Sequence, residues 1–292
     1  MKHKVLYYMV DGSTEAGQAA LDAIEGGNQI ELVGCAHEPN VCPTAEQLAG
    51  CEGFVGEFGP VDDACADAMA AQHTVALMLD LMRQVTLLNR DVRDGAWNPL
   101  GGYTMHRTQG RTLGLVFFGS IARAVAPIAQ ALGMKVLVWA PTKTAEELAA
   151  AGCAKAQTLD ELLGASDIVS LHCPLIPETE KLIGKRELAL MKPTAFLINT
   201  ARGPIVDENA LVAALDEGIA SGGTRGICGA ALDVLADETA PNQALIAHPR
   251  CIVTPHCAYS TQEAYDTVRR MSLQAVVDKL VFNRKPEHTV TE

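Results

Sequence analysis

Two hydrophobic patterns alternate along most of this chain: short continuous apolar runs, and longer segments in which apolar residues recur every three or four positions. The stretch 111–141 shows both patterns most clearly. Residues 113–118 form a continuous apolar run, which is typical of a parallel strand covered on both faces. Apolar side chains then recur at helical spacing over 121–132, Gly133 ends that segment, and a second apolar run covers 134–139. This order predicts the first βαβ unit of a doubly wound α/β fold.

The same alternation continues on both sides of this unit. One long apolar helix over 66–89 is expected to be buried between domains or subunits, and 91–111 is expected to be a linker with at most short helices. The other predicted strands cover 5–10, 30–35, 53–58, 156–158, 168–172, 195–199, 226–234 and 251–254, and the other predicted helices cover 14–24, 44–48, 145–151, 159–163, 185–191, 208–217 and 260–282.

The turn after the first strand of the central unit only partly fits the dinucleotide-binding fingerprint Gly-x-Gly-x-x-Gly. Phe117, Gly119 and Ala122 stand at its three glycine positions. Gly119 would let the backbone approach a pyrophosphate, and Ala122 is permitted, whereas Phe117 departs from the pattern. The acidic residue expected after the second strand is replaced by Ala140. The topology therefore favours a nucleotide site more strongly than the turn sequence does.

Composition excludes several classes of function. The 292 residues carry a net charge of −12 without a cluster of lysine and arginine, which argues against a nucleic-acid partner. The nine cysteines are scattered singly without metal-ligand spacing, so we expect reduced thiols in a cytoplasmic protein and no metal site. The apolar run at 5–10 is too short for a signal peptide or a membrane span, and no membrane association is expected.

Three polar residues follow three of the predicted strands: Arg202, Glu238 and His256. The carboxyl ends of parallel strands open onto one crevice, so these residues can converge although they are far apart in sequence. Arginine suits a carboxylate, histidine transfers a proton near neutral pH, and a carboxylate beside the imidazole fixes its tautomer. Together they predict hydride transfer between a nicotinamide and a 2-hydroxy/2-oxo acid.

Each of these residues also has a simpler interpretation. Arg202 alone could cap a helix at the surface, Glu238 belongs to a short acidic run, and His256 alone could fill a polar corner. Their joint placement at strand ends favours the catalytic interpretation. His172 also ends a strand but has no evident partner, so it is interpreted as structural or cofactor-lining.

At these residues the chain resembles the D-isomer-specific 2-hydroxyacid dehydrogenases, the family of D-3-phosphoglycerate dehydrogenase, glyoxylate/hydroxypyruvate reductase and the C-terminal-binding-protein corepressors. The resemblance extends over about 65–265. The blocks that carry it are 70–79, 95–97, 111–141, 171–179, 199–207, 229–234 and 254–256.

The resemblance implies a doubly wound, Rossmann-type dinucleotide-binding domain over 66–265. It also implies a smaller, flavodoxin-like substrate (catalytic) domain made of 1–65 and 266–292, and a homodimer. Arg202 would bind the substrate carboxylate and 2-oxo group, His256 would be the acid/base, and Glu238 would be its partner. The cofactor-binding residues would be Gly119, Ser120, Ile121, Pro174, Thr200, Ala201, Arg202, Asp233 and His256.

Three departures from the family pattern affect this interpretation. Phe117 adds strain if its position requires a positive φ. Ala140 removes a partner for the ribose of NAD, and Thr142 and Lys143 could receive the 2′-phosphate of NADP, so NADP(H) is expected to bind at least as readily as NAD(H). The family's N-terminal domain has further strands where this chain passes from 59–63 directly into the long helix, so one wall of the substrate pocket is expected to be missing.

Two functional hypotheses follow. The first is an NAD(P)-dependent reductase of small 2-oxo acids. The second is a non-catalytic or impaired relative that acts as a dinucleotide-sensing or protein-binding dimer. Phe117 and the shortened N-terminal domain favour the second hypothesis, and the complete set of Arg202, Glu238 and His256 favours the first.

Overall fold

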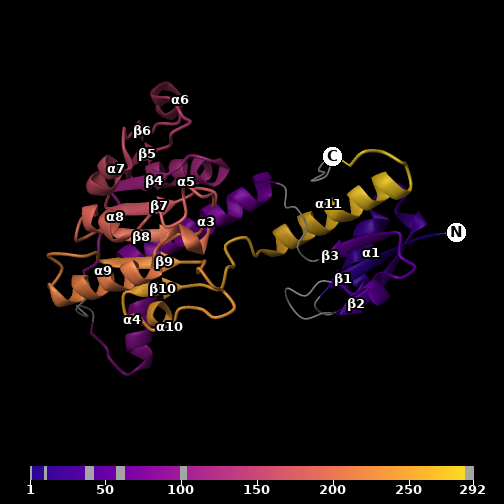
Figure 1. Ribbon diagram of the computed structural model, residues 1–292, viewed down its shortest axis with the longest axis horizontal. Coiled ribbons are helices and arrows are strands. Elements are labelled where there is room, and N and C mark those ends of the chain that lie inside the picture. Colours follow the sequence, from indigo (N-terminus) through magenta and orange to yellow (C-terminus); the bar gives the residue numbers. More distant parts are fainter. Residues whose placement is uncertain (1, 10–11, 37–42, 57–62, 99–103, 287–292) are drawn as a thin grey trace. The chain divides into compact units, whose positions relative to one another are not determined.

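The computed structural model describes residues 2–9, 12–36, 43–56, 63–98 and 104–286. The chain forms two compact units (Figure 1). The smaller unit contains Met1–Ala66 and Ser260–Glu292, and the larger one contains Asp67–Tyr259. The predicted domain boundary at 265/266 falls inside the last helix, α11 (Gln262–Leu280), which lies wholly in the smaller unit.

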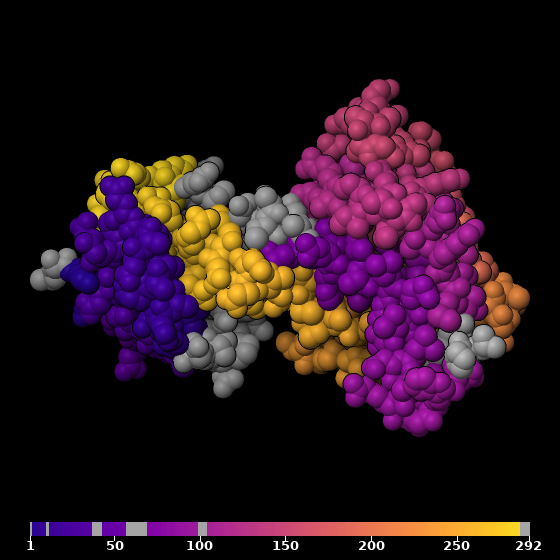
Figure 2. Space-filling model, turned by 180° about the vertical axis from the view of Figure 1, so that it is seen from behind, coloured from indigo at the N-terminus to yellow at the C-terminus, as the bar shows by residue number. Residues whose placement is uncertain are grey.

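The smaller unit is built on a three-stranded parallel sheet in the order β2-β1-β3. Its strands are β1 (His3–Met9), β2 (Ile30–Ala36) and β3 (Gly53–Gly56), and its other helices are α1 (Glu15–Asp22), η1 (Gly27–Gln29) and α2 (Ala45–Leu48). Leu273 and Val277 of α11 are buried in one apolar cluster with strand residues. The C-terminal helix, yellow in Figures 1 and 2, therefore completes the core of the indigo N-terminal sheet. The predicted strand residues Val10, Glu57 and Phe58 lie outside the described residues.

The larger unit contains a seven-stranded parallel sheet in the order β10-β9-β8-β7-β4-β5-β6. Strand β4 (Thr112–Val116) pairs with β5 (Lys135–Trp139) on one side and with β7 (Ile168–Leu171) on the other. The strand order therefore reverses beside β4, which is the switch point of a doubly wound sheet, where ligands bind beyond the carboxyl ends of the strands. The remaining strands are β6 (Ala154–Lys155), β8 (Phe196–Asn199), β9 (Gly229–Leu232) and β10 (Cys251–Val253).

Helices cover both faces of this sheet (Figure 1). Leu113 and Leu115 of β4 belong to the apolar cluster on one face, whereas Val116 belongs to the cluster on the other. Because side chains alternate between faces and both faces are buried, the strand sequence is apolar throughout. The doubly wound parallel fold predicted from these runs is confirmed. The covering helices include α5 (Ser120–Ala131), α6 (Ala145–Ala150), α7 (Leu159–Ala165), α8 (Lys185–Leu190) and α9 (Glu208–Ala220).

The prediction of one helix over 66–89 is wrong. The structure has α3 (Asp63–Arg83) and α4 (Val85–Arg93), separated by Gln84 in a left-handed conformation with φ 56°. The Asp80 carboxylate accepts a hydrogen bond from the backbone N–H of Thr86 at 2.8 Å and so satisfies a donor at the start of α4. Apolar residues continue through the break, so their spacing did not reveal it.

The apolar face of α3 packs inside the larger unit itself. Leu77, Met78, Leu81 and Met82 are buried in the same cluster as Leu115 of the sheet. The hydrophobicity of this helix is therefore explained without a partner subunit.

Smaller differences concern short elements. Strand β6 lies two residues earlier than the predicted 156–158, and α9 extends to Ala220 beyond the predicted 217. The short helices α10 (Gln243–Ile246) and η2 (Gly203–Ile205) were not predicted. Among the residues described, no helix has the length and hydrophobicity that crossing a bilayer requires.

Candidate active site at the carboxyl edge of the larger sheet

The turn between β4 and α5 leaves the start of α5 open. Gly119 is the N-cap residue, and no side chain caps the helix there. A Cβ atom on Gly119 would meet no other heavy atom within 4 Å. The N–H groups and the dipole at the start of a helix favour an anionic group, so this opening fits a pyrophosphate.

Phe117 has φ 71°, a left-handed conformation that side chains other than glycine rarely adopt. Its N–H donates to the carbonyl of Trp139 at 2.7 Å, and its ring packs edge-on against the Trp139 ring with centroids 5.7 Å apart. Phe117 therefore has the positive φ that is expected of the glycine at this position of the fingerprint. Next to Trp139, the side chain of Ala140 is 2% exposed.

The two residues expected to receive a 2′-phosphate differ in their surroundings. Thr142 is exposed. The Lys143 ammonium lies 3.2 Å from Oε1 of Glu147, whose other carboxylate oxygen accepts from the N–H of Thr144 at 2.7 Å. The Lys155 ammonium donates to the Lys143 carbonyl at 2.6 Å, so two cations and one carboxylate surround this position.

His256 and Glu238 form the pair predicted from the sequence. Nδ1 of His256 lies 2.9 Å from Oε2 of Glu238, and both side chains are partly exposed. His256 has φ 51°, and its N–H donates to the carbonyls of Asp233 at 2.7 Å and Thr254 at 3.0 Å. Nδ1 faces the carboxylate, so Nε2 is the ring nitrogen that Glu238 does not contact. The His256 ring also packs edge-on against Tyr259, with centroids 6.0 Å apart.

Arg202 follows β8 and is exposed. Its guanidinium donates to the Ala201 carbonyl at 2.6 Å. The turn is held by the Asn199 amide, which accepts from the Ala201 N–H at 3.0 Å and donates to the Arg202 carbonyl at 2.9 Å. Strands β8, β9 and β10 are parallel neighbours, so Arg202, Glu238 and His256 follow adjacent strands at one edge of the sheet.

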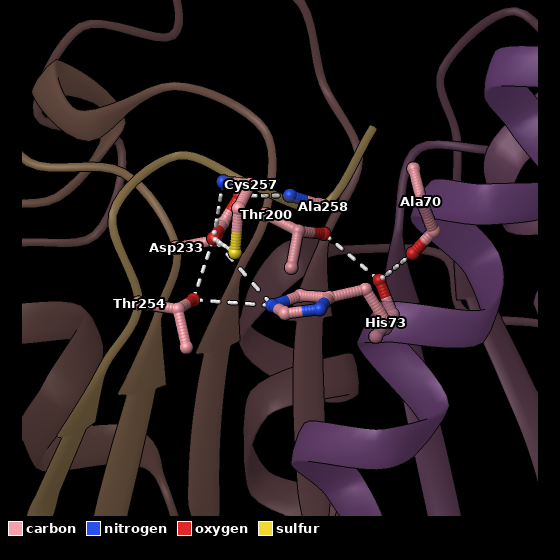
Figure 3. A network of polar contacts seen from close by, with 8 residues as sticks. Ala70, His73, Thr200, Asp233, Thr254, Cys257 and Ala258 are labelled. Carbon is pink, nitrogen blue, oxygen red and sulfur yellow. Dashed lines mark hydrogen bonds and ion pairs between the residues drawn. The ribbon is translucent and has the colours of Figure 1, made fainter. Parts of the chain in front are cut away.

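Asp233, directly after β9, is the centre of a polar network (Figure 3). Its buried carboxylate accepts from the Thr254 hydroxyl at 2.5 Å and from the N–H groups of Cys257 and Ala258 at 2.9 Å each. Nε2 of His73 lies 3.5 Å away. Burial alone would raise the pKa of Asp233, but these hydrogen bonds lower it to about 2. Asp233 is therefore ionised at neutral pH.

Helix α3 contributes side chains that sequence reasoning missed. His73 contacts the Thr254 hydroxyl at 3.1 Å, and the buried Thr74 hydroxyl contacts that of Thr200 at 2.9 Å and donates to the Ala70 carbonyl at 2.7 Å. More than a hundred residues separate His73 from Thr254 and Thr74 from Thr200, so no local spacing reveals these pairs.

His172, interpreted from the sequence as structural or cofactor-lining, has a partner that the sequence did not reveal. Its Nε2 lies 2.9 Å from the Ser170 hydroxyl, and burial lowers its pKa to about 4. The imidazole is therefore neutral at physiological pH. Pro174, two residues on, is exposed, and its carbonyl accepts from the Thr179 hydroxyl at 2.6 Å.

Sequence comparison shows which known proteins this chain resembles. Residues 75–258 match the family model described as D-isomer specific 2-hydroxyacid dehydrogenase, NAD binding domain. The chain is 37% identical over 243 residues to the D-3-phosphoglycerate dehydrogenase of a Synechocystis strain, covering 82% of this chain and 41% of that protein. It is 38% identical over 212 residues to the glyoxylate reductase of Thermococcus litoralis, covering 70% and 60%. The chain thus spans only part of the length of these relatives.

Two solved structures match this chain over almost its entire length. The TT0316 protein of Thermus thermophilus has a TM-score of 0.80 at 28% identity, covering 99% of this chain and all of that one. The D-lactate dehydrogenase of Lactobacillus jensenii, solved with NAD⁺, has a TM-score of 0.78 at 26% identity, with the same coverage.

Proposed function

Because the chain belongs to the D-isomer specific 2-hydroxyacid dehydrogenase family, we propose that it is an oxidoreductase that transfers a hydride between a nicotinamide cofactor and a small 2-hydroxy/2-oxo acid. The observation that carries this proposal is the His256–Glu238 pair, 2.9 Å apart, at the sheet edge that also presents Arg202. The alternative, a dinucleotide-sensing or protein-binding dimer without catalysis, is favoured by the positive φ of Phe117 at the nucleotide turn.

In the direction of reduction, the Arg202 guanidinium binds the carboxylate of the 2-oxo acid and polarises the neighbouring carbonyl. Nε2 of His256 donates a proton to the oxygen as the carbonyl becomes an alcohol. Glu238 accepts from Nδ1–H, which fixes the tautomer and orients the ring. When bound, the nicotinamide supplies the hydride.

The proposed cofactor-binding residues extend from the start of α5 to the loop after β10. Gly119, Ser120 and Ile121 would bind the pyrophosphate with backbone N–H groups. The ionised Asp233 would accept a hydrogen bond from the nicotinamide carboxamide. The residues proposed to line the remaining surface are Thr142, Lys143, Pro174, Thr200, Ala201, Arg202 and His256.

We propose that NADP(H) binds at least as readily as NAD(H). Ala140 provides neither a hydrogen bond to a ribose hydroxyl nor a charge that repels a phosphate. Lys143 and Lys155 lie close by, and the Glu147 carboxylate offsets part of their charge. In fluorescence titrations, the Kd for NADPH should equal or lie below that for NADH, and Ala140→Asp should reverse the order. Tenfold tighter binding of NADH to the unaltered protein would reject this preference.

The domain roles remain those expected from the sequence. We propose that 66–265 binds the dinucleotide, and that 1–65 with 266–292 forms a shortened substrate domain. The predicted junction 59–63 lies almost entirely outside the described residues. Free thiols at the seven cysteines whose side chains the structure describes support a reducing, cytoplasmic location.

We also propose that the chain forms a homodimer. The support is no longer the long apolar helix predicted over 66–89 but a set of exposed apolar side chains. The apolar face of α3 is already covered in its own unit, but Val85 and Val92 of α4 are 59% and 48% exposed, and Trp97 is 87% exposed. Apolar side chains exposed at one segment indicate a protein contact. Val92→Glu should lower the mass measured by light scattering, whereas Leu175→Glu, at another exposed apolar residue, should not.

The enzymatic proposal is tested by NADH and NADPH oxidation with a panel of small 2-oxo acids. We expect turnover with at least one acid, a rate at least a thousandfold lower in His256→Ala, and a raised KM in Arg202→Lys. Cofactor titration of the same variants separates loss of chemistry from loss of binding. Cofactor binding without turnover across the panel would favour the non-catalytic alternative.

A further inference from the structure

His73, Asp233 and Cys257 bring three different metal-binding donor atoms together in the larger unit (Figure 3). Nε2 of His73 lies 3.5 Å from Oδ1 of Asp233, and Sγ of Cys257 lies 3.6 Å from the same oxygen. All three atoms lie within 4.8 Å of one another. They come from α3, the end of β9 and the loop after β10, so the tertiary fold assembles the group.

These separations suit a tetrahedral zinc ion. Zinc bonds of about 2.0–2.3 Å to nitrogen, oxygen and sulfur place neighbouring ligand atoms about 3.3–3.7 Å apart. The two separations that involve Asp233 already fall in this range. The third, between His73 and Cys257, is at most 4.8 Å, so a metal would shorten it by about 1.1–1.5 Å at most.

The surroundings of the three residues favour a cation. The N–H groups of Cys257 and Ala258 hold the orientation of the Asp233 carboxylate, as the outer partners of metal ligands do. The Asp233 side chain is buried, the His73 side chain is 23% exposed, and Cys257 is half-buried.

We propose that His73, Asp233 and Cys257 form a binding site for one zinc ion, with water or the Thr254 hydroxyl as the fourth ligand. Imidazole nitrogen, thiolate and carboxylate are the donors that zinc accepts, and three protein ligands leave one position open. The metal replaces the proton on Cys257 Sγ, and the remaining imidazole proton of His73 resides on Nδ1. One proton is released to solvent for each metal bound, and no residue is oxidised or reduced.

Zinc and cofactor exclude each other in this scheme. Asp233 Oδ1 would be a metal ligand in one state and the acceptor for the nicotinamide carboxamide in the other. This consequence rests on the proposed function, whereas the metal site itself does not. Zinc would then act as an inhibitor that is displaced by a high concentration of dinucleotide.

Cobalt(II) titration of the full-length, reduced protein tests the site, because a thiolate ligand gives Co²⁺ a charge-transfer band in the near ultraviolet. We expect one equivalent of Co²⁺ with this band, and its displacement by Zn²⁺. Cys257→Ser should abolish the band, and His73→Gln should weaken Co²⁺ binding at least tenfold. Cys228→Ser, at another half-buried cysteine of the same unit, is the matched control and should retain the band.

Thermal melts of each variant verify folding, and Cys257→Ala provides a second thiol-free variant. Absence of the band in the unaltered protein, or its loss in Cys228→Ser but not in Cys257→Ser, would overturn the site. NADH should release Co²⁺ from the unaltered protein. A Co²⁺ site that NADH leaves unchanged would reject the exclusion, and a Co²⁺ site in a protein without turnover would reject only the enzymatic proposal.

Discussion

At the residue scale, two positions combine an unfavourable local property with a defined contact. Phe117 has a φ that favours glycine while its ring packs on Trp139. His172 is held neutral by burial while its ring contacts Ser170. Such positions are stable only because the surrounding structure compensates for them.

Replacing Phe117 separates backbone strain from ring packing. Phe117→Ala and Phe117→Gly both delete the ring, but only glycine adopts φ 71° without strain. We expect the glycine variant to be more stable than the alanine variant by about 1 kcal/mol. Urea denaturation followed by tryptophan fluorescence measures the difference. Equal stability of the two variants would show that this turn relaxes away from the left-handed conformation.

The lowered pKa of His172 predicts that the stability of the protein depends on pH. The native pKa is about 4, below the ordinary value of 6.5, so the unfolded chain binds a proton first as the pH falls. Above pH 6.5 neither the native nor the unfolded state binds this proton, so His172 does not lower the free energy of unfolding there. As the pH falls from 6.5 towards 4, the unfolded state gains the proton first and the free energy of unfolding decreases. Because His172 as a whole is only half-buried, we expect a loss of about 1–2 kcal/mol over this range.

Urea midpoints between pH 7 and pH 4.5 test this dependence. His172→Gln should remove it, whereas His3→Gln, at a histidine beside Glu52 at the surface of the smaller unit, should leave it in place. An unchanged pH dependence in His172→Gln would show that a group other than His172 causes it.

At the element scale, the start of α5 is the feature on which cofactor binding depends. Gly119 faces open space, whereas a Cβ on Gly114 of β4 would lie 2.2 Å from the Ser166 hydroxyl and 2.8 Å from a Leu162 methyl group. These two glycines therefore serve different purposes: one leaves room for a ligand, and the other permits close packing of a helix on the sheet.

Alanine at each glycine distinguishes the two purposes. Gly119→Ala should lower stability by about 1 kcal/mol or less and weaken NADH binding about tenfold, because the methyl group would occupy the pyrophosphate position. Gly114→Ala should destabilise the fold by about 1–3 kcal/mol through overpacking. Thermal melts and NADH titration measure both effects. Unchanged NADH affinity in Gly119→Ala would contradict a pyrophosphate at this turn.

At the scale of the whole molecule, the sequence was sufficient for the doubly wound sheet, because burial on both faces imposes apolar runs such as 113–118. It also predicted the His256–Glu238 pair, since each residue follows a recognisable strand. The sequence was insufficient for the break at Gln84, because the apolar spacing continues through this single left-handed residue. It missed the partners of Asp233 on α3, because contacts between distant segments depend on how the helix packs on the sheet.

We propose that the hydride transfer by this chain has the D stereochemistry of its family. The most direct measurement is incubation with NADH deuterated at the transferable position and an accepted 2-oxo acid, followed by chiral separation and mass analysis of the product. Hydride transfer by this chain predicts a D-2-hydroxy acid with deuterium at C2, and no such product from His256→Ala. An L product, or a product without deuterium at C2, would contradict it.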